Sequence, residues 1–431
     1  MLKTKSVLEL LTKSEIILNN NYRVNYTIPS SNLYPHQWSW DSCWIIFAYA
    51  NIGWHEKAEN ELRSLFKYQW KNGLIPSIIF HDLSDNTYFP GPEYWNLKEK
   101  AKEIAVKDTC TGIVQPPIHS HACLEIFYAN KNKLFLEEMY PKLLKWHEYL
   151  YNYRDLDNEG IVFIRHPWES GMDNSPNWDE ALSRIQINKF KYSKLRTDNK
   201  KVNDDERPTD LTYERYLFLI ELFKKCNYNE ATIVENSEFI IQDVLFNVLL
   251  IKSNYALLEI GKILQKDISK IELWIELAEK NFKKFFINNF YYNFDLKKKT
   301  HIFKKTISGI SPIFLNLNPE LIIKELKTNF LDIENNNYKI STLARSDNQF
   351  NSINYWRGPM WINLSWLILS SLEKFDKTLS MNIKKDCIKV IKNKGFYEYF
   401  DSLPNGNGCG DNKFSWTAAI CICLINNMKL F

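Results

Sequence analysis

The chain has 431 residues, of which 45% are hydrophobic and 25% charged, a composition typical of soluble globular proteins. Its 55 basic and 51 acidic side chains are spread along the sequence, so we expect no binding to nucleic acid or to a membrane surface. We recognise no export signal, no 18-residue apolar run and no C-x-x-C spacing among the eight cysteines, which predicts a cytoplasmic protein with free thiols.

Apolar residues recur at three- and four-residue spacing along most of the chain and predict roughly a dozen helices, whereas alternating strand patterns are scarce. Irregular segments rich in Trp, Tyr, Pro and Gly precede several of them. We therefore predict one all-α domain over residues 1–431, a ring of helical hairpins whose long loops meet at one end. After an N-terminal helix, helices are expected at about 42–51, 55–70, 118–129, 135–153, from 210, 231–265, 268–288, 319–329, 362–372, 381–394 and 415–427.

The segment from His166 to Asp179 is the most suggestive irregular stretch. It contains three acids, two tryptophans, two prolines and a glycine, without a helical or strand rhythm. Trp168 and Trp178 bracket Asp173, and indole faces around a carboxyl would grip a sugar and keep the acid protonated. A surface turn with two anchoring tryptophans is the alternative.

Other common chemistries lack their motifs. There is no G-x-S-x-G, phosphate loop, H-E-x-x-H or dinucleotide-type glycine run. His119 and His121 would point to different faces of a helix, so we expect no metal site and no cofactor. Carboxylates among aromatic residues remain, which is the composition of a glycoside hydrolase site.

Several short segments between the predicted helices share a polar-aromatic character. They are YPHQWSWD at 34–41, YFPGPEYW at 88–95, HPWESGMDNSP at 166–176, RPT at 207–209, YWRGPMWIN at 355–363, FYEYF at 396–400 and FSWTA at 414–418. In this order they resemble the motifs of glycoside hydrolase family 63, and within it the bacterial mannosylglycerate and glucosylglycerate hydrolase group. The resemblance runs from about residue 30 to the C-terminus and implies an (α/α)6 barrel.

The resemblance implies an inverting mechanism with two carboxyl groups standing about 6.5 to 9.5 Å apart. Asp173 matches the general acid and Glu398 the general base. Glu169 could be the acid itself, but we favour a role as a charged neighbour that raises the pKa of Asp173. Asp401 or Asp411 could replace Glu398.

The resemblance also implies a set of substrate-binding residues. Asp41 is expected to hold sugar hydroxyls, although it could simply cap a helix. Arg207, Tyr213 and Tyr88 match positions that contact an acidic aglycone, and Arg207 could instead pair with Asp205. The sugar at the cleaved bond would be enclosed by Tyr34, Trp38, Trp40, Gln115, Trp168, Trp356 and Trp361, and the set is completed by Tyr355, Gly358 and Trp416.

The expected activity is hydrolysis of a small α-glycoside, such as glucosylglycerate or mannosylglycerate, to free sugar and glycerate. One alternative is an α-glucosidase or trehalase-like hydrolase of a neutral di- or oligosaccharide, and another is a catalytically silent sugar-binding barrel. The residues do not distinguish a glucose from a mannose substrate or define an oligomeric state. The charge-dense segment 196–206 is expected to be a loop over the site or a disordered insertion.

Overall fold

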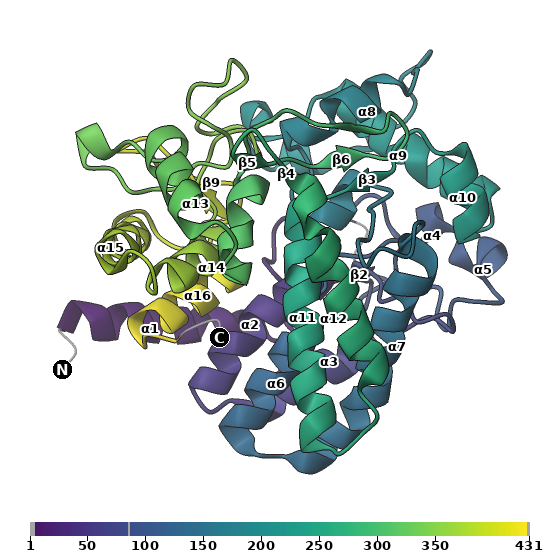
Figure 1. Ribbon diagram of the computed structural model, residues 1–431, viewed down its shortest axis with the longest axis horizontal. Coiled ribbons are helices and arrows are strands. Elements are labelled where there is room, and N and C mark those ends of the chain that lie inside the picture. Colours follow the sequence, from purple (N-terminus) through teal and green to yellow (C-terminus); the bar gives the residue numbers. More distant parts are fainter. Residues whose placement is uncertain (1–4, 85–86, 429–431) are drawn as a thin grey trace.

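The computed structural model describes residues 5–84 and 87–428, which form helices and only two-residue strands (Figure 1). Six inner elements pack in a closed ring, in which each contacts the next and the last returns to the first. They are α2 (Ser39–Asn51), α6 (His119–Asn130), α11 (Val244–Ile263), η7 (Ile307–Leu315), α14 (Ile362–Leu372) and α16 (Ser415–Ile425). The predicted (α/α)6 ring of hairpins is confirmed.

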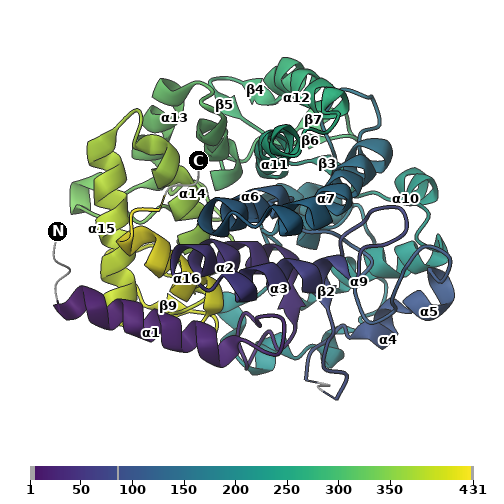
Figure 2. The same cartoon turned by 90° about the horizontal axis from the view of Figure 1, so that it is seen from below.

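An outer helix packs against each inner element. In the same order these are α3 (His55–Phe66), α7 (Lys133–Arg154), α12 (Ser269–Asn281), α13 (Pro319–Glu325), α15 (Lys377–Lys394) and α1 (Lys5–Asn21). The sixth pair, α1 with α16, joins the two ends of the chain, and Figure 2 shows these helices side by side. Asn21 of α1 strengthens this closure, because its Nδ2 donates to Oγ of Ser415 over 2.9 Å.

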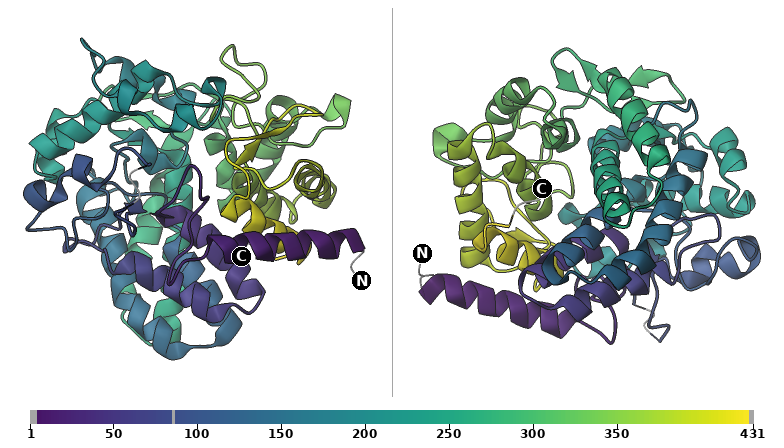
Figure 3. Two further views of the ribbon diagram at one scale, coloured as in Figure 1. Left: turned by 180° about the vertical axis from the view of Figure 1, so that it is seen from behind. Right: turned by 60° about the horizontal axis from the view of Figure 1, so that its bottom comes forward.

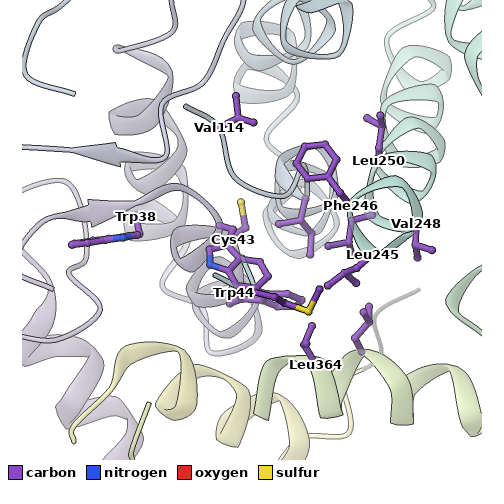
Figure 4. Close-up of a cluster of buried hydrophobic side chains, with 14 of the residues drawn as sticks. Trp38, Cys43, Trp44, Val114, Leu245, Phe246, Val248, Leu250 and Leu364 are labelled. Atoms are coloured by element: carbon purple, nitrogen blue, oxygen red, sulfur yellow. The ribbon is translucent and has the colours of Figure 1, made fainter. Parts of the chain in front are cut away.

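The core lies inside the ring, where apolar residues of different inner helices meet. Trp44 of α2, Phe246 of α11 and Leu364 of α14 are almost completely buried in one cluster (Figure 4). Burying side chains of this size stabilises the fold by about 1.5–3 kcal/mol each. Among the described residues, α11 alone is long and apolar enough to cross a membrane, but 78% of its most apolar stretch is buried within the barrel.

Further elements gather around the ring, and α8 to α10 lie with the sheet β3-β6-β7 at one of its ends (Figures 1 and 3). One of them is long, α9 (Asp210–Lys225). The short helices are α4 (Pro92–Trp95), α5 (Leu97–Lys100), α8 (Asp179–Ser183), α10 (Glu230–Asn236), η1 (Pro167–Ser170), η2 (Pro176–Trp178), η3 (Ser193–Leu195), η4 (Asp198–Lys200), η5 (Asp204–Glu206), η6 (Phe282–Phe285), the π-helix η8 (Leu326–Phe330) and η9 (Ile333–Asn335).

All strand pairs are antiparallel. The strand β1 (Gln37–Trp38) pairs with β2 (Ile78–Ile79), β6 (Phe294–Asp295) pairs with both β3 (Ile241–Gln242) and β7 (Thr300–His301), β4 (Phe286–Ile287) pairs with β5 (Phe290–Tyr291), and β8 (Tyr399–Phe400) pairs with β9 (Gly408–Cys409). The first and last of these pairs brace segments that line the pocket described below.

One helix prediction was wrong, and one inner element was not predicted. The pattern over 231–265 is not one helix, since it breaks after α10 and restarts at α11, where the Asp243 carboxylate accepts from the Phe246 backbone N–H over 3.0 Å. The inner element η7 escaped prediction because Pro312 interrupts its helical pattern. Its Gly309 is required by close packing, since a Cβ there would lie 2.2 Å from the Phe290 ring.

Candidate active site

One pocket forms where the segments that precede the inner helices meet. Gln115 precedes α6, Trp356 precedes α14, Glu398 precedes α16, and Trp40 and Asp41 lie in the first turn of α2. The pocket holds about 990 Å³ of space including its open mouth. Among the residues expected to bind substrate or act in catalysis, its wall contains Tyr34, Trp38, Trp40, Asp41, Tyr88, Gln115, Trp168, Asp173, Arg207, Tyr213, Tyr355, Trp356, Glu398 and Trp416.

Asp173 reaches the pocket through a tight turn. Gly171 has a φ of +72°, and a Cβ there would lie 2.6 Å from the Trp40 ring, so only glycine lets the turn lie against this indole. The Tyr216 hydroxyl donates to the Asp173 backbone carbonyl over 2.7 Å. Burial raises the pKa of the Asp173 carboxyl to about 7, and the nearby charge of Glu398 adds to the effect. A substantial fraction of Asp173 is therefore protonated at neutral pH.

Glu398 is more deeply buried than Asp173, with 1% of the residue exposed, and it has three donors. Its Oε1 accepts from the hydroxyls of Tyr34 (2.8 Å) and Tyr355 (2.9 Å), and its Oε2 accepts from Nη2 of Arg207 (3.2 Å). Burial raises the pKa of Glu398, while the guanidinium and both hydroxyls oppose that shift. Gly410 lies directly against this carboxylate, since a Cβ there would be 2.2 Å from Oε2. Glu398 is thus an oriented carboxylate.

The remaining acids divide clearly between the pocket and its surroundings. Asp41 lines the pocket, and burial raises its pKa well above the ordinary range, with the charge of Glu398 contributing. Asp411 instead accepts from the Leu33 backbone N–H over 3.2 Å, and Asp401 accepts from a backbone N–H two residues further on. Neither Asp401 nor Asp411 lines the pocket, so the geometry does not favour them as alternatives to Glu398.

Trp361 and Gly358 were expected to touch substrate, but they lie behind the wall. Trp361 stacks on Trp356 with ring centroids 3.6 Å apart, and Trp356 alone of the two faces the pocket. A Cβ on Gly358, whose φ is +153°, would lie 2.4 Å from the Asn351 carbonyl oxygen. Its role is to permit the turn. Trp356 also has a left-handed backbone with φ of 60°, a strained conformation typical of functional sites.

The expectation that Glu169 tunes the acid was wrong. Its carboxylate points away from the pocket and accepts from Nη1 of Arg154 over 2.9 Å, with Arg165 also adjacent. These two guanidinium groups lower the pKa of Glu169 and neutralise its charge, whereas burial and the charge of Glu398 raise the pKa of Asp173. Trp178 is likewise buried below the loop, where its indole N–H donates to the Met172 carbonyl over 2.7 Å.

Arg207 has different partners from those expected. Its Nη1 donates to the Tyr34 hydroxyl over 2.9 Å and its Nη2 to Glu398, and it forms no ion pair with Asp205. No described residue accepts a hydrogen bond from its buried Nε. Among the described residues that line the pocket, Arg207 is the sole lysine or arginine. It is therefore both a support for Glu398 and the main cation available to a ligand.

Sequence reasoning missed several residues of the wall. Gly171 had a usable signal, because it lies between Trp168 and Asp173 in the segment already singled out. Asp198 had none, because it is one of many charges in the segment 196–206, which folds into η4 and η5 and brings Thr197 and Asp198 to the pocket. The other missed residues are Leu33, Ser77, Ile78, Phe89, Pro208, Tyr216 and Phe414.

A helical-hairpin barrel with a protonated acid and an oriented carboxylate among aromatic rings has the features of a glycoside hydrolase. The family model for the "Mannosylglycerate hydrolase MGH1-like glycoside hydrolase domain" matches residues 34–417. The chain belongs to this family of glycoside hydrolases, which confirms the resemblance to family 63.

Relatives and solved structures match the chain over nearly its whole length. A mannosylglycerate hydrolase of Rubrobacter radiotolerans is 35% identical over 96% of each chain. A glucosylglycerate hydrolase of Mycolicibacterium hassiacum is 28% identical and covers 95% of this chain and 96% of its own. The crystal structure of a family 63 mannosylglycerate hydrolase from Thermus thermophilus, in complex with Tris and D-glycerate, has a TM-score of 0.86 at 33% identity, covering 96% of this chain and 99% of its own.

Proposed function

We propose that the chain hydrolyses a small α-glycoside of glycerate, such as glucosylglycerate or mannosylglycerate, with inversion at the anomeric carbon. Asp173 acts as general acid and Glu398 as general base. One observation carries this assignment: the two carboxyls share a pocket in which burial raises the pKa of Asp173 to about 7, whereas Arg207, Tyr34 and Tyr355 donate to Glu398 and stabilise its charged form. Inversion requires about 6.5–9.5 Å between them, so that a water fits.

The proton transfers follow from this arrangement. Asp173 donates its proton to the glycosidic oxygen as the bond to the anomeric carbon breaks, and glycerate leaves with that proton on its new hydroxyl. Glu398 removes a proton from the water that attacks the opposite face of the sugar. Tyr34, Tyr355 and Arg207 hold the carboxylate of Glu398 in one orientation, which keeps it aimed at the water. Exchange with solvent then restores both protonation states.

Neighbouring residues account for substrate binding. A protonated Asp41 both donates and accepts hydrogen bonds, which suits a sugar hydroxyl. The indole N–H of Trp356 has no acceptor among the described residues and is a second candidate donor to the sugar. Arg207 offers its cation to the glycerate carboxylate. The free cysteines fit a reducing compartment such as the cytoplasm.

The substrate assignment is tested with glucosylglycerate, mannosylglycerate and trehalose, while NMR follows the anomer of the released sugar. We expect the β-anomer to appear first from a glycerate glycoside, with trehalose cleaved far more slowly. Release of the α-anomer would contradict the mechanism. Preferential cleavage of trehalose would move the substrate class to neutral sugars.

Substrates with different leaving groups distinguish the role of the general acid from that of the general base. Fluoride needs no proton to depart, so Asp173→Asn should lose about 10²–10⁴-fold in kcat on a glycerate glycoside but far less on the α-glycosyl fluoride. Glu398→Gln should lose activity on both. Asp401→Asn is the matched control, since this acid lies outside the pocket, and it should leave kcat on both substrates unchanged. Equal losses for Asp173→Asn on both substrates would reject it as the acid.

A further inference from the structure

Asp198 lines the catalytic pocket, yet neither the acid and base nor the sugar-enclosing rings account for it. It lies in η4 with 27% of its side chain exposed, on the same wall as Asp173 and Arg207. Its negative charge acts on Tyr88 and Tyr213, whose hydroxyl pKa values it helps to raise. These neighbours place Asp198 at the end of the pocket where the aglycone would lie.

Arg196 fixes the orientation of the Asp198 carboxylate. Its Nε donates to Oδ1 over 3.0 Å and its Nη2 to Oδ2 over 2.8 Å, and these bonds keep the pKa of Asp198 low. The remaining nitrogen, Nη1, donates to Asp210 and to the Pro208 carbonyl, each over 2.9 Å. Arg196 is thereby fully engaged. A carboxylate has about four acceptor positions, so Asp198 retains positions for a ligand.

The charges at this end of the pocket oppose each other. Arg207 attracts the carboxylate of an acidic aglycone, whereas Asp198 repels it. A carboxylate is therefore drawn toward Arg207, and a hydroxyl group is the chemically suitable partner for Asp198. Glycerate linked through its central oxygen carries both groups, a carboxylate on one neighbouring carbon and a primary hydroxyl on the other.

We propose that Asp198 accepts a hydrogen bond from the free primary hydroxyl of the aglycone, and so selects glycerate over three-carbon acids that lack this hydroxyl. The inference rests on the proposed glycerate function. It adds the residue that binds the primary hydroxyl, which is the second polar group of the aglycone beside the carboxylate. It makes Asp198 a specificity-determining residue with a role separate from those of Asp173 and Glu398.

Four glycosides of the sugar that the enzyme cleaves test the hydroxyl and the carboxylate separately. Their aglycones, all linked through the central oxygen, are glycerate, lactate, propane-1,2-diol and propan-2-ol. Glycerate has both groups, lactate only the carboxylate, the diol only the hydroxyl, and propan-2-ol neither. We expect kcat/KM of the unmodified enzyme to be about 10- to 100-fold higher for glycerate than for lactate, because loss of the hydroxyl leaves the acceptor position of Asp198 that Arg196 does not occupy without a donor.

The preference should disappear in Asp198→Ala. The variant should lose more activity on the two hydroxyl-bearing glycosides than on the lactate and propan-2-ol glycosides, so that the kcat/KM ratios of glycerate to lactate and of the diol to propan-2-ol both fall toward one. Asp210→Ala is the matched control: it removes the other carboxylate bound to Arg196, but Asp210 does not line the pocket, so the preference should persist. Asp198→Asn retains one acceptor oxygen and should keep part of the preference.

The proposal is overturned if the unmodified enzyme shows no hydroxyl preference, a result that does not depend on any variant folding correctly. It is also overturned if Asp198→Ala slows all four glycosides equally, because the hydroxyl preference would then belong to another residue. The comparison of glycerate with propane-1,2-diol tests the carboxylate, and its outcome does not depend on the role of Asp198. If glycerate and the diol are cleaved equally well, the glycerate function fails while the hydroxyl comparison still reports on Asp198.

Discussion

Burial raises the pKa of both Asp173 and Glu398, and the hydrogen-bond donors around each carboxyl determine which of the two is held in its charged form. No described side chain donates a hydrogen bond to the carboxyl of Asp173, so burial dominates its pKa. Glu398 accepts from a guanidinium and two hydroxyls, which stabilise its charged form. Arg207 therefore cannot be tested simply as an aglycone contact, because its removal would also release Glu398.

This difference predicts a bell-shaped pH dependence of kcat/KM. Asp173 must be protonated to act, and its pKa is about 7, so activity should fall as the pH rises through that value. Glu398 must be ionised, and its pKa is raised above the ordinary range, so activity should fall on the acidic side. The measurement is a pH series with a glycerate glycoside and with the corresponding glycosyl fluoride. The alkaline decline should vanish with fluoride, and its persistence would mean that another group causes it.

At the scale of elements, the loop that carries Asp173 rests on a buried group of four charges. Glu169 of the loop and Glu230 of α10 are both bound by Arg154 and Arg165, and all four side chains are at most 6% exposed. Buried charges are retained only when each is compensated. The cluster therefore joins α7, α10 and the catalytic loop into one rigid support.

Removing one charge from this cluster should destabilise the folded protein strongly. Glu169→Gln leaves an uncompensated guanidinium in the interior, and we expect the free energy of unfolding to fall by about 3–5 kcal/mol, measured by urea denaturation. Glu138→Gln is the control, since Glu138 pairs with Arg63 and Lys142 at the surface with 37% of its side chain exposed. That change should cost no more than about 1 kcal/mol. Equal effects of the two substitutions would show that the buried cluster is not a structural support.

The limits of sequence reasoning are visible in the same loop. Polar-aromatic segments before helices correctly indicated which parts of the chain meet, because a ring of hairpins brings helix starts to one end. Sequence order could not show that Asp173 faces the pocket while Glu169, four positions earlier, faces two arginines. Trp361 was misplaced for a similar reason, since a second tryptophan layer has the same composition as the first. Side-chain direction in irregular segments depends on tertiary contacts.

At the scale of the whole molecule, the barrel is closed by its two ends. Asn21 near the start of the chain donates to Ser415 near its end and to the Lys413 carbonyl over 3.0 Å. The pocket also combines Tyr34 with Glu398, so neither end of the chain forms the site alone. Because every hairpin packs against two neighbours in the ring, we expect no hairpin to unfold before the others.

We therefore predict that the chain unfolds as one cooperative domain. Tryptophan fluorescence reports on the pocket and core, and far-UV circular dichroism reports on the helices, so the two urea transitions should coincide. Asn21→Ala should lower the free energy of unfolding by about 1–3 kcal/mol and shift both midpoints downward together, because Lys413 and Ser415 lose a buried partner. Asn19→Ala is the control on the same helix, where the side chain is exposed and, among the residues that the structure describes, accepts only from Lys57. If Asn21→Ala separated the two transitions, the sixth hairpin would be an independent unit and the closed ring would not unfold as a whole.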